Sequence, residues 1–144
     1  MNPPRIFLDA SALFAAAYST TGAARELLRL GITGDVELVT NAFAVEEALR
    51  NIGRKAPDVL PLLEALLATL PITIHPAPSK TAVTTVAEYV ELKDAPIVAG
   101  AIDAAADFLA TFDRRHLLTV NVVAERSGLQ VVTPGDILAQ LRSN

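Results

Sequence analysis

Five short apolar segments that alternate with stretches of helical periodicity constrain the fold of this chain more than any other feature. The apolar segments span residues 5–9, 36–40, 71–76, 108–112 and 129–133. Between them apolar residues recur at helical intervals, as Val45, Leu49 and Ile52 do. Short apolar strands joined by helices are typical of a parallel sheet that is covered on both faces. We therefore expect an α/β fold, a three-layer α/β/α sandwich with a central parallel five-stranded sheet, in which residues 1–144 form a single domain.

The composition narrows the chemistry that the chain can perform. It has 144 residues, of which 51% are hydrophobic, and it has no cysteine. These values exclude a disordered chain, a disulfide framework and a thiolate metal site. The formal net charge of −4 is unusual for a nucleic-acid binder, unless carboxylates hold divalent cations that reverse the local field.

No segment has the pattern of a membrane-spanning helix, which needs about 20 consecutive apolar residues. The N-terminal stretch MNPPRIFLDASALF carries an aspartate inside its short apolar run and does not resemble a signal peptide. We therefore expect a cytoplasmic protein with no membrane partner.

Two aspartates directly follow apolar segments. Asp9 ends the segment that begins at Arg5, and Asp113 follows Phe112. The carboxyl ends of parallel strands lie along one edge of a sheet, and ligands in such folds bind beyond that edge. Both aspartates also have structural interpretations, because Asp9 can cap the helix that follows it and Asp113 can head a turn. Position alone does not separate a ligand from a cap at either residue.

Two further acidic residues lie on helices that lead away from this edge. Glu47 lies close to the apolar stripe of its helix, whereas Glu46 lies about 100° further round. A glutamate beside an apolar stripe usually needs a partner or a metal, although pairing with Arg50 or Asn51 is the simpler alternative. Asp94 begins a helix, where an N-cap role is again the simpler alternative. Both residues gain functional meaning only if the fold brings them beside the strand-end aspartates.

Convergence of the four acids would create a cation site. Four carboxylates in one crevice would repel each other and raise each other's pKa, and a cation would relieve that repulsion. Oxygen ligands without cysteine or a histidine pair suit Mg²⁺ or Mn²⁺ rather than zinc. Two other aspartates of the same region do not qualify. Asp103 lies about two and a half turns after Asp94 and faces away from the start of that helix, and Asp107 precedes its strand at the amino end.

Three motifs carry all four acids in order along the chain. They are FLDASAL at residues 7–13, VTNAFAVEEALRNI at 39–52 and DAPIVAGAIDAAADFLATFDRRHL at 94–117. This ordered set, with the closing Val-Val-Thr-Pro stretch, resembles the PIN-domain family, which includes the toxins of VapBC toxin–antitoxin systems. Two residues depart from the family pattern: Ala106 replaces a frequent glycine, and Asn41 replaces a small hydroxyl residue. Neither departure removes an acid.

The resemblance implies a PIN-like fold and a Mg²⁺- or Mn²⁺-dependent endoribonuclease that hydrolyses RNA phosphodiester bonds. The residues that it assigns to both catalysis and metal binding are Asp9, Glu47, Asp94 and Asp113. Glu46 is the alternative to Glu47. The resemblance also implies a homodimer and, if the protein is a toxin, a cognate antitoxin that blocks the site.

Several polar residues near the four acids have supporting roles on this interpretation. Ser11 and Thr111 would hold the metal ligands in place, and Arg114 and Arg115 would contact substrate phosphates. A solvated surface is the default for these arginines and for a second basic cluster beyond Glu47, which consists of Arg50, Arg54 and Lys55. By the same default, Glu91 is a surface acid, His116 is an ordinary loop histidine and His75 is structural.

Three other interpretations compete with the nuclease. A catalytically weak PIN-like domain would serve as an RNA-binding or assembly module, although the presence of four acids argues against this. A phosphate-transfer receiver domain with Asp9 as phosphoacceptor would need a lysine on a late strand, where this chain has arginines. A nucleotide-binding protein would need a GxGxxG or GxxxxGK[ST] loop, and the sequence contains neither.

Overall fold

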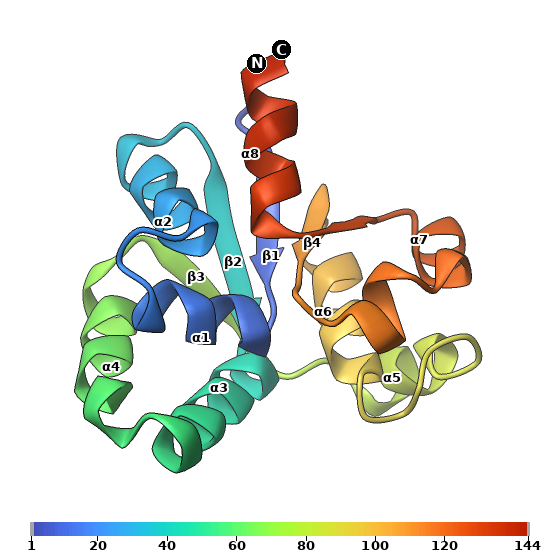
Figure 1. Cartoon of the computed structure of the whole chain (residues 1–144). Helices are drawn as coiled ribbons and strands as arrows, with labels where there is room; N and C mark the ends of the chain where they lie inside the picture. The colour runs from blue at the N-terminus through green and yellow to red at the C-terminus, as the bar shows by residue number, and fades with distance from the viewer. Residues whose placement is uncertain (1, 144) are drawn as a thin grey trace.

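The computed structural model describes residues 2–143 and contains five parallel strands in the order β3-β2-β1-β4-β5 (Figure 1). The strands are β1 (Arg5–Leu8), β2 (Glu37–Asn41), β3 (Ile72–His75), β4 (Phe108–Ala110) and β5 (Gln130–Val132). All pairings between neighbouring strands are parallel. The predicted parallel five-stranded sheet is confirmed, with each strand inside or one residue beyond its predicted segment.

Helices connect the strands and cover the sheet. They are α1 (Ala10–Tyr18), α2 (Ala23–Thr33), α3 (Ala42–Lys55), α4 (Leu60–Thr69), α5 (Lys80–Val86), α6 (Ala95–Asp103), α7 (Asn121–Ser127) and α8 (Pro134–Ser143), with a 3₁₀ turn η1 (Pro57–Val59) and a π turn η2 (Arg114–Leu118). Within residues 2–143, no helix is both long enough and apolar enough to cross a membrane.

Helix α5 ends at Val86, although apolar residues continue at helical spacing as far as Val90. Its last residues are β-branched, and the hydroxyls of Thr84 and Thr85 donate to the carbonyls one turn back, at Lys80 and Thr81. Such bonds compete with helical continuation. After Val86 the chain therefore runs through turns as far as the start of α6.

Helices α2 and α6 pack on opposite faces of the sheet (Figure 1). Gly31 of α2 lies against Leu38 of β2, while Gly100 of α6 lies against Phe7 of β1. Leu38 is in register with Ile6, and successive strand residues point to opposite faces. The centre of the sheet is thus a buried middle layer that includes Ile6–Leu8 of β1, whereas Thr73 and Ile74 of the edge strand β3 are exposed.

The strand order decides which loops meet at the carboxyl edge of the sheet. Strand β1 lies between β2 and β4, with Leu8 in register with Ala110. The residues that follow these two strands are therefore neighbours, and the Asp9 amide still donates to the Ala110 carbonyl at 3.2 Å. Helices α1 and α3 begin at this same edge (Figure 1).

One buried amide joins the helices that carry two of the candidate acids. Asn41 is fully buried; its Oδ1 accepts from the Ala44 amide at 2.9 Å, and its Nδ2 donates to the Pro96 carbonyl at 3.1 Å. It thereby caps α3 and holds the first turn of α6. A Cβ at Gly100 would overlap Nδ2 of Asn41 and lie 3.3 Å from Cε2 of Phe7. The amide at position 41 fits because position 100 has no side chain.

We predict that Gly100→Ala destabilises the protein by about 1–3 kcal/mol, because the new methyl group displaces a buried and hydrogen-bonded amide. Gly53 is the matched control: it is exposed in α3, and nothing lies within 4 Å of a Cβ built there. Gly53→Ala should stabilise the helix by up to about 1 kcal/mol. Urea unfolding of both variants measures this contrast. Equal or greater stability of Gly100→Ala would contradict the packing described for Asn41.

Candidate metal centre and active site

A cleft of about 410 Å³ opens at the carboxyl edge of the sheet, and all four predicted acids line it: Asp9, Glu47, Asp94 and Asp113. They come from four separate parts of the chain, namely the end of β1, the middle of α3, the residue before α6 and the loop after β4. The structure therefore brings the predicted set together, although no single element carries more than one of these acids.

Asp9 is the most deeply buried of the four, with 6% of its surface exposed. Its Oδ1 accepts from the Ser11 hydroxyl at 2.6 Å and from the Ala12 amide at 2.8 Å. The predicted N-cap is thus present, and it leaves the carboxyl group in the cleft wall. Burial raises the pKa of Asp9 to about 6; hydrogen bonds from Ser11, Thr111 and Ala12 oppose this shift, and the charge of Glu47 adds to it.

Two hydroxyl groups fasten the end of β1 to the loop after β4. Besides donating to Asp9, the Ser11 Oγ accepts from the Phe112 amide at 2.9 Å. The buried Thr111 Oγ1 accepts from the Asp113 amide at 3.0 Å. These contacts place Ser11 and Thr111 where the sequence expected supporting hydroxyls, next to the two strand-end aspartates.

The adjacent glutamates of α3 have different surroundings. Glu47 is half-buried and lines the cleft. The side chain of Glu46 is 78% exposed and lies 3.9 Å from Arg50, the pairing that was the simpler alternative for its neighbour. Burial raises the pKa of Glu47, and the charge of Asp94 raises it further. Helical geometry alone thus separates the two residues.

Asp94 does not make the predicted cap. It precedes α6, yet its side chain accepts no cap hydrogen bond. Its Oδ2 is buried and has no hydrogen-bond partner among residues 2–143. Burial raises its pKa, the charge of Asp113 adds to this, and the charges of Lys93 and His116 oppose it. A buried carboxylate oxygen without a partner is unfavourable, and a divalent cation in the cleft would satisfy it.

Asp113 does make its predicted turn. Its side chain accepts from the His116 amide at 3.0 Å and so begins η2, where Arg114 and Arg115 follow. Both arginines are exposed and lie outside the lining of the cleft. From the second basic cluster, Lys55 lines the cleft together with Asn51, whereas Arg50 and Arg54 do not. The structure therefore separates residues that the sequence grouped together.

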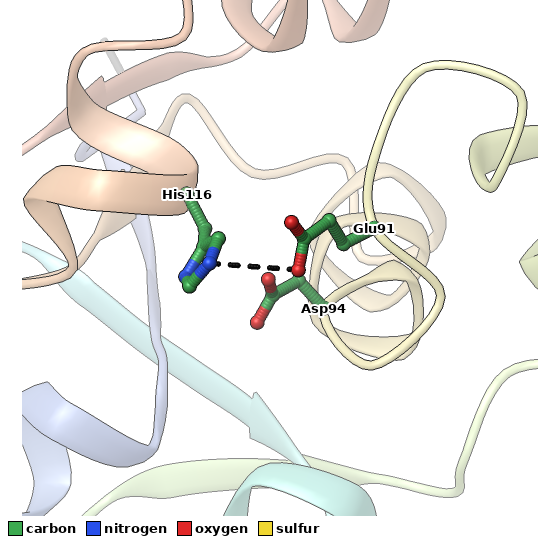
Figure 2. A group of neighbouring side chains, drawn as sticks. All are labelled: Glu91, Asp94 and His116. Carbon is green, nitrogen blue, oxygen red and sulfur yellow. Dashed lines mark ion pairs between the residues drawn. The ribbon is translucent and has the colours of Figure 1, made fainter.

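Two residues assigned to the surface and to an ordinary loop lie beside Asp94. Glu91 and His116 each bring one ligand atom into a group with Asp94 in which all such atoms lie within 4.8 Å of one another (Figure 2). This Glu–Asp–His group could hold a metal ion. The only sequence signal was spacing, because Glu91 precedes Asp94 by one turn and His116 follows Asp113 by one turn.

The two excluded aspartates stay outside the cleft. Asp107 Oδ2 accepts from the Arg5 amide at 2.7 Å and ties the start of β1 to the start of β4. Asp103 is exposed at the end of α6. The structural and solvent assignments of these residues are confirmed.

Comparison with known proteins agrees with this geometry. A model of the PIN domain family matches residues 6–122. No curated protein sequence matches the chain significantly. Among solved structures, PAE2754 from Pyrobaculum aerophilum is 18% identical, with a TM-score of 0.66 and an alignment that covers 98% of this chain and 91% of that one.

Two further solved structures share the fold. VapC20 from Mycobacterium tuberculosis, a toxin that cleaves the sarcin–ricin loop, is 15% identical with a TM-score of 0.59. The alignment covers 76% of this chain and 91% of the VapC20 chain. VapBC2 from Rickettsia felis, solved with a DNA fragment from its promoter, is 12% identical with a TM-score of 0.61, and the alignment covers 89% of this chain and 96% of that one. Because the family model spans most of the chain, including all four acids of the cleft, this chain belongs to the PIN domain family.

Proposed function

We propose that this chain is a Mg²⁺- or Mn²⁺-dependent endoribonuclease that acts as the toxin of a toxin–antitoxin pair. The observation that carries the proposal is the buried Asp94 oxygen without a partner, in a cleft that three further carboxylates line. Burial raises the pKa of Asp9, Glu47 and Asp94, and the charges of neighbouring carboxylates raise it further; a divalent cation is the ligand that reverses this effect. Family membership and the likeness to VapC20, which cleaves the sarcin–ricin loop, support RNA as the substrate.

The four carboxylates would hold the cation, directly or through water, and Ser11 and Thr111 would fix the positions of Asp9 and Asp113 through the hydrogen bonds described above. A bound Mg²⁺ or Mn²⁺ supplies a Lewis acid for the scissile phosphate and lowers the pKa of a coordinated water. The carboxylates would orient that water and accept its proton. Phe14 and Ile97 in the cleft wall would exclude bulk water from this reaction.

Positive charge for the RNA backbone would come from the cleft wall and from the surface next to Asp113. Lys55 lies in its wall, two turns beyond Glu47 on α3. Arg114 and Arg115 are exposed on η2, directly after Asp113. Phosphate contacts of this kind position a substrate without reading its sequence. We therefore assign substrate positioning to Lys55 and to the two arginines.

The proposed partners follow from the family. VapBC systems pair a toxin with an antitoxin, and we propose that a cognate antitoxin covers the cleft and that two copies of this chain form a homodimer. The competing proposal is a domain that binds RNA or assembles with other proteins but cleaves poorly. Cleavage assays with variants of the cleft separate the two proposals.

We predict that Glu47→Gln lowers the rate of Mn²⁺-dependent RNA cleavage on the order of 10²-fold or more, because it removes a charged ligand from the centre that stabilises the transition state. Asp9→Asn should have a loss of the same order. Glu46→Gln is the matched control: it makes the same chemical change on the same helix, one residue away and outside the cleft. Its rate should equal that of the wild type. Equal loss in both glutamate variants, or in neither, would refute the proposed site.

We predict that the metal-free protein loses stability as the pH rises from about 4 to about 6. The fold raises the pKa of Asp9 from its ordinary value of 3.8 to about 6. Between these two pKa values the folded state binds more protons than the unfolded state. The stability that protonated Asp9 contributes is therefore fully present below pH 3.8 and is lost above about pH 6. The contribution of Asp9 to this loss is about 3 kcal/mol.

Unfolding in EDTA over this pH range measures the effect. Because asparagine can keep the cap bonds and carries no charge, Asp9→Asn should gain stability relative to the wild type by about 3 kcal/mol as the pH rises. The exposed Asp103→Asn serves as the control and should follow the wild type at every pH. If the difference in unfolding free energy between Asp9→Asn and the wild type did not change with pH, burial would not raise the pKa of Asp9.

A further inference from the structure

Glu91, Asp94 and His116 form a compact donor group beside the four-carboxylate cleft. The Nε2 atom of His116 lies 3.5 Å from Oε2 of Glu91, and Figure 2 shows both side chains directed toward Asp94. The group comes from two segments, the turns after α5 and the π turn η2. Only Asp94 belongs both to this group and to the lining of the cleft.

The other ring nitrogen of His116 has its own partners. Its Nδ1 lies 3.4 Å from Oδ2 of Asp113 and 3.4 Å from Nζ of Lys93. When Nδ1 carries the hydrogen, it can donate to Oδ2 of Asp113, and the contact with Lys93 is then not a hydrogen bond. The lone pair of Nε2 is in that case free on the side of Glu91 and Asp94. A carboxylate that accepts from the distal nitrogen of a histidine is the usual support for a metal-binding imidazole.

The buried oxygen of Asp94, which also supports the cleft ion, is a sign of a missing ligand on this residue. Oδ2 has no hydrogen-bond partner among residues 2–143. A carboxylate has two oxygens that can serve two ions, and carboxylates shared by a pair of divalent cations recur in phosphodiester hydrolysis. The position of Asp94 between the cleft and the Glu91–His116 pair fits such a shared ligand.

We propose that the chain binds a second divalent cation between Glu91, Asp94 and Nε2 of His116, next to the ion of the four-carboxylate cleft and sharing Asp94 with it. This inference rests on the proposed function, because the cleft ion is part of it. The nitrogen donor distinguishes the two positions. Imidazole favours first-row transition ions over Mg²⁺, so the second position selects Mn²⁺, whereas the all-oxygen cleft accepts either ion.

The experiment is pulsed electron paramagnetic resonance of Mn²⁺ bound to the full chain. A coordinated imidazole adds nitrogen modulation to the spin echo of Mn²⁺, at frequencies distinct from the proton modulation that water ligands give, and carboxylate or water ligands add none. The chain has two histidines, so two variants assign the signal. His75 ends β3 and lines a different pocket. We expect nitrogen modulation in the wild type and in His75→Gln, and none in His116→Gln.

Titration of the same samples counts the bound ions. We expect the wild type to bind a second Mn²⁺ and both Glu91→Gln and His116→Gln to bind it at least about tenfold more weakly, with the cleft ion retained. A single bound ion without nitrogen modulation in the wild type would overturn the second position. His116 would then only contact Glu91 and Asp113. Modulation that persists in His116→Gln would overturn it equally.

The Asp9→Asn variant separates this inference from the proposed function, because Asp9 belongs to the cleft alone. Nitrogen modulation should survive in that variant while RNA cleavage is lost. If the wild type shows modulation but cleaves no RNA, the second position stands and the nuclease proposal fails. If the wild type cleaves RNA with one ion and no modulation, the nuclease proposal stands and the second position fails.

Discussion

The burial of Asp9 at the carboxyl end of the central strand is the constraint on which the rest of the site depends. Strand β1 lies between two strands and its residues Ile6–Leu8 are buried, so the residue after Leu8 is also buried and meets solvent only through the cleft. Hydrogen bonds from Ser11 and the Ala12 amide offset part of the unfavourable burial, and the pKa of Asp9 still rises to about 6. The negative charge of Glu47 raises the pKa of Asp9 further. The fold therefore stores electrostatic strain that a divalent cation would release.

The same edge depends on the amide of Asn41. This side chain caps α3, which carries Glu47, and holds the first turn of α6, which follows Asp94. A small hydroxyl residue, the common choice at this position in the family pattern, has too short a side chain to make both contacts in the same way. The departure at Asn41 is matched by Gly100, whose missing Cβ leaves room for the amide. A change that looks minor in the sequence thus sets the relative placement of two helices in the site.

Sequence reasoning predicted the parts of the site that regular geometry determines. Parallel strands must end at one edge, which placed Asp9 and Asp113 together, and helical periodicity favoured Glu47 over Glu46. The remaining parts depend on irregular segments. The turns after α5 bring Glu91 beside Asp94, and the π turn η2 brings His116 to them; neither conformation has a periodic sequence signal. The sequence also contained no sign that an oxygen of Asp94 lacks a hydrogen-bond partner, because an aspartate directly before a helix normally caps that helix.

The central claim is that the four carboxylates of the cleft together hold a divalent cation. Anomalous diffraction from crystals soaked in Mn²⁺ tests it most directly, because the anomalous signal locates the ion without reference to activity. The account predicts a peak within coordination distance of Asp9, Glu47 and Asp94, with Asp113 bound directly or through water, and its loss in crystals of Asp9→Asn. Ordered crystals that contain Mn²⁺ elsewhere but show no peak in this cleft would contradict the account.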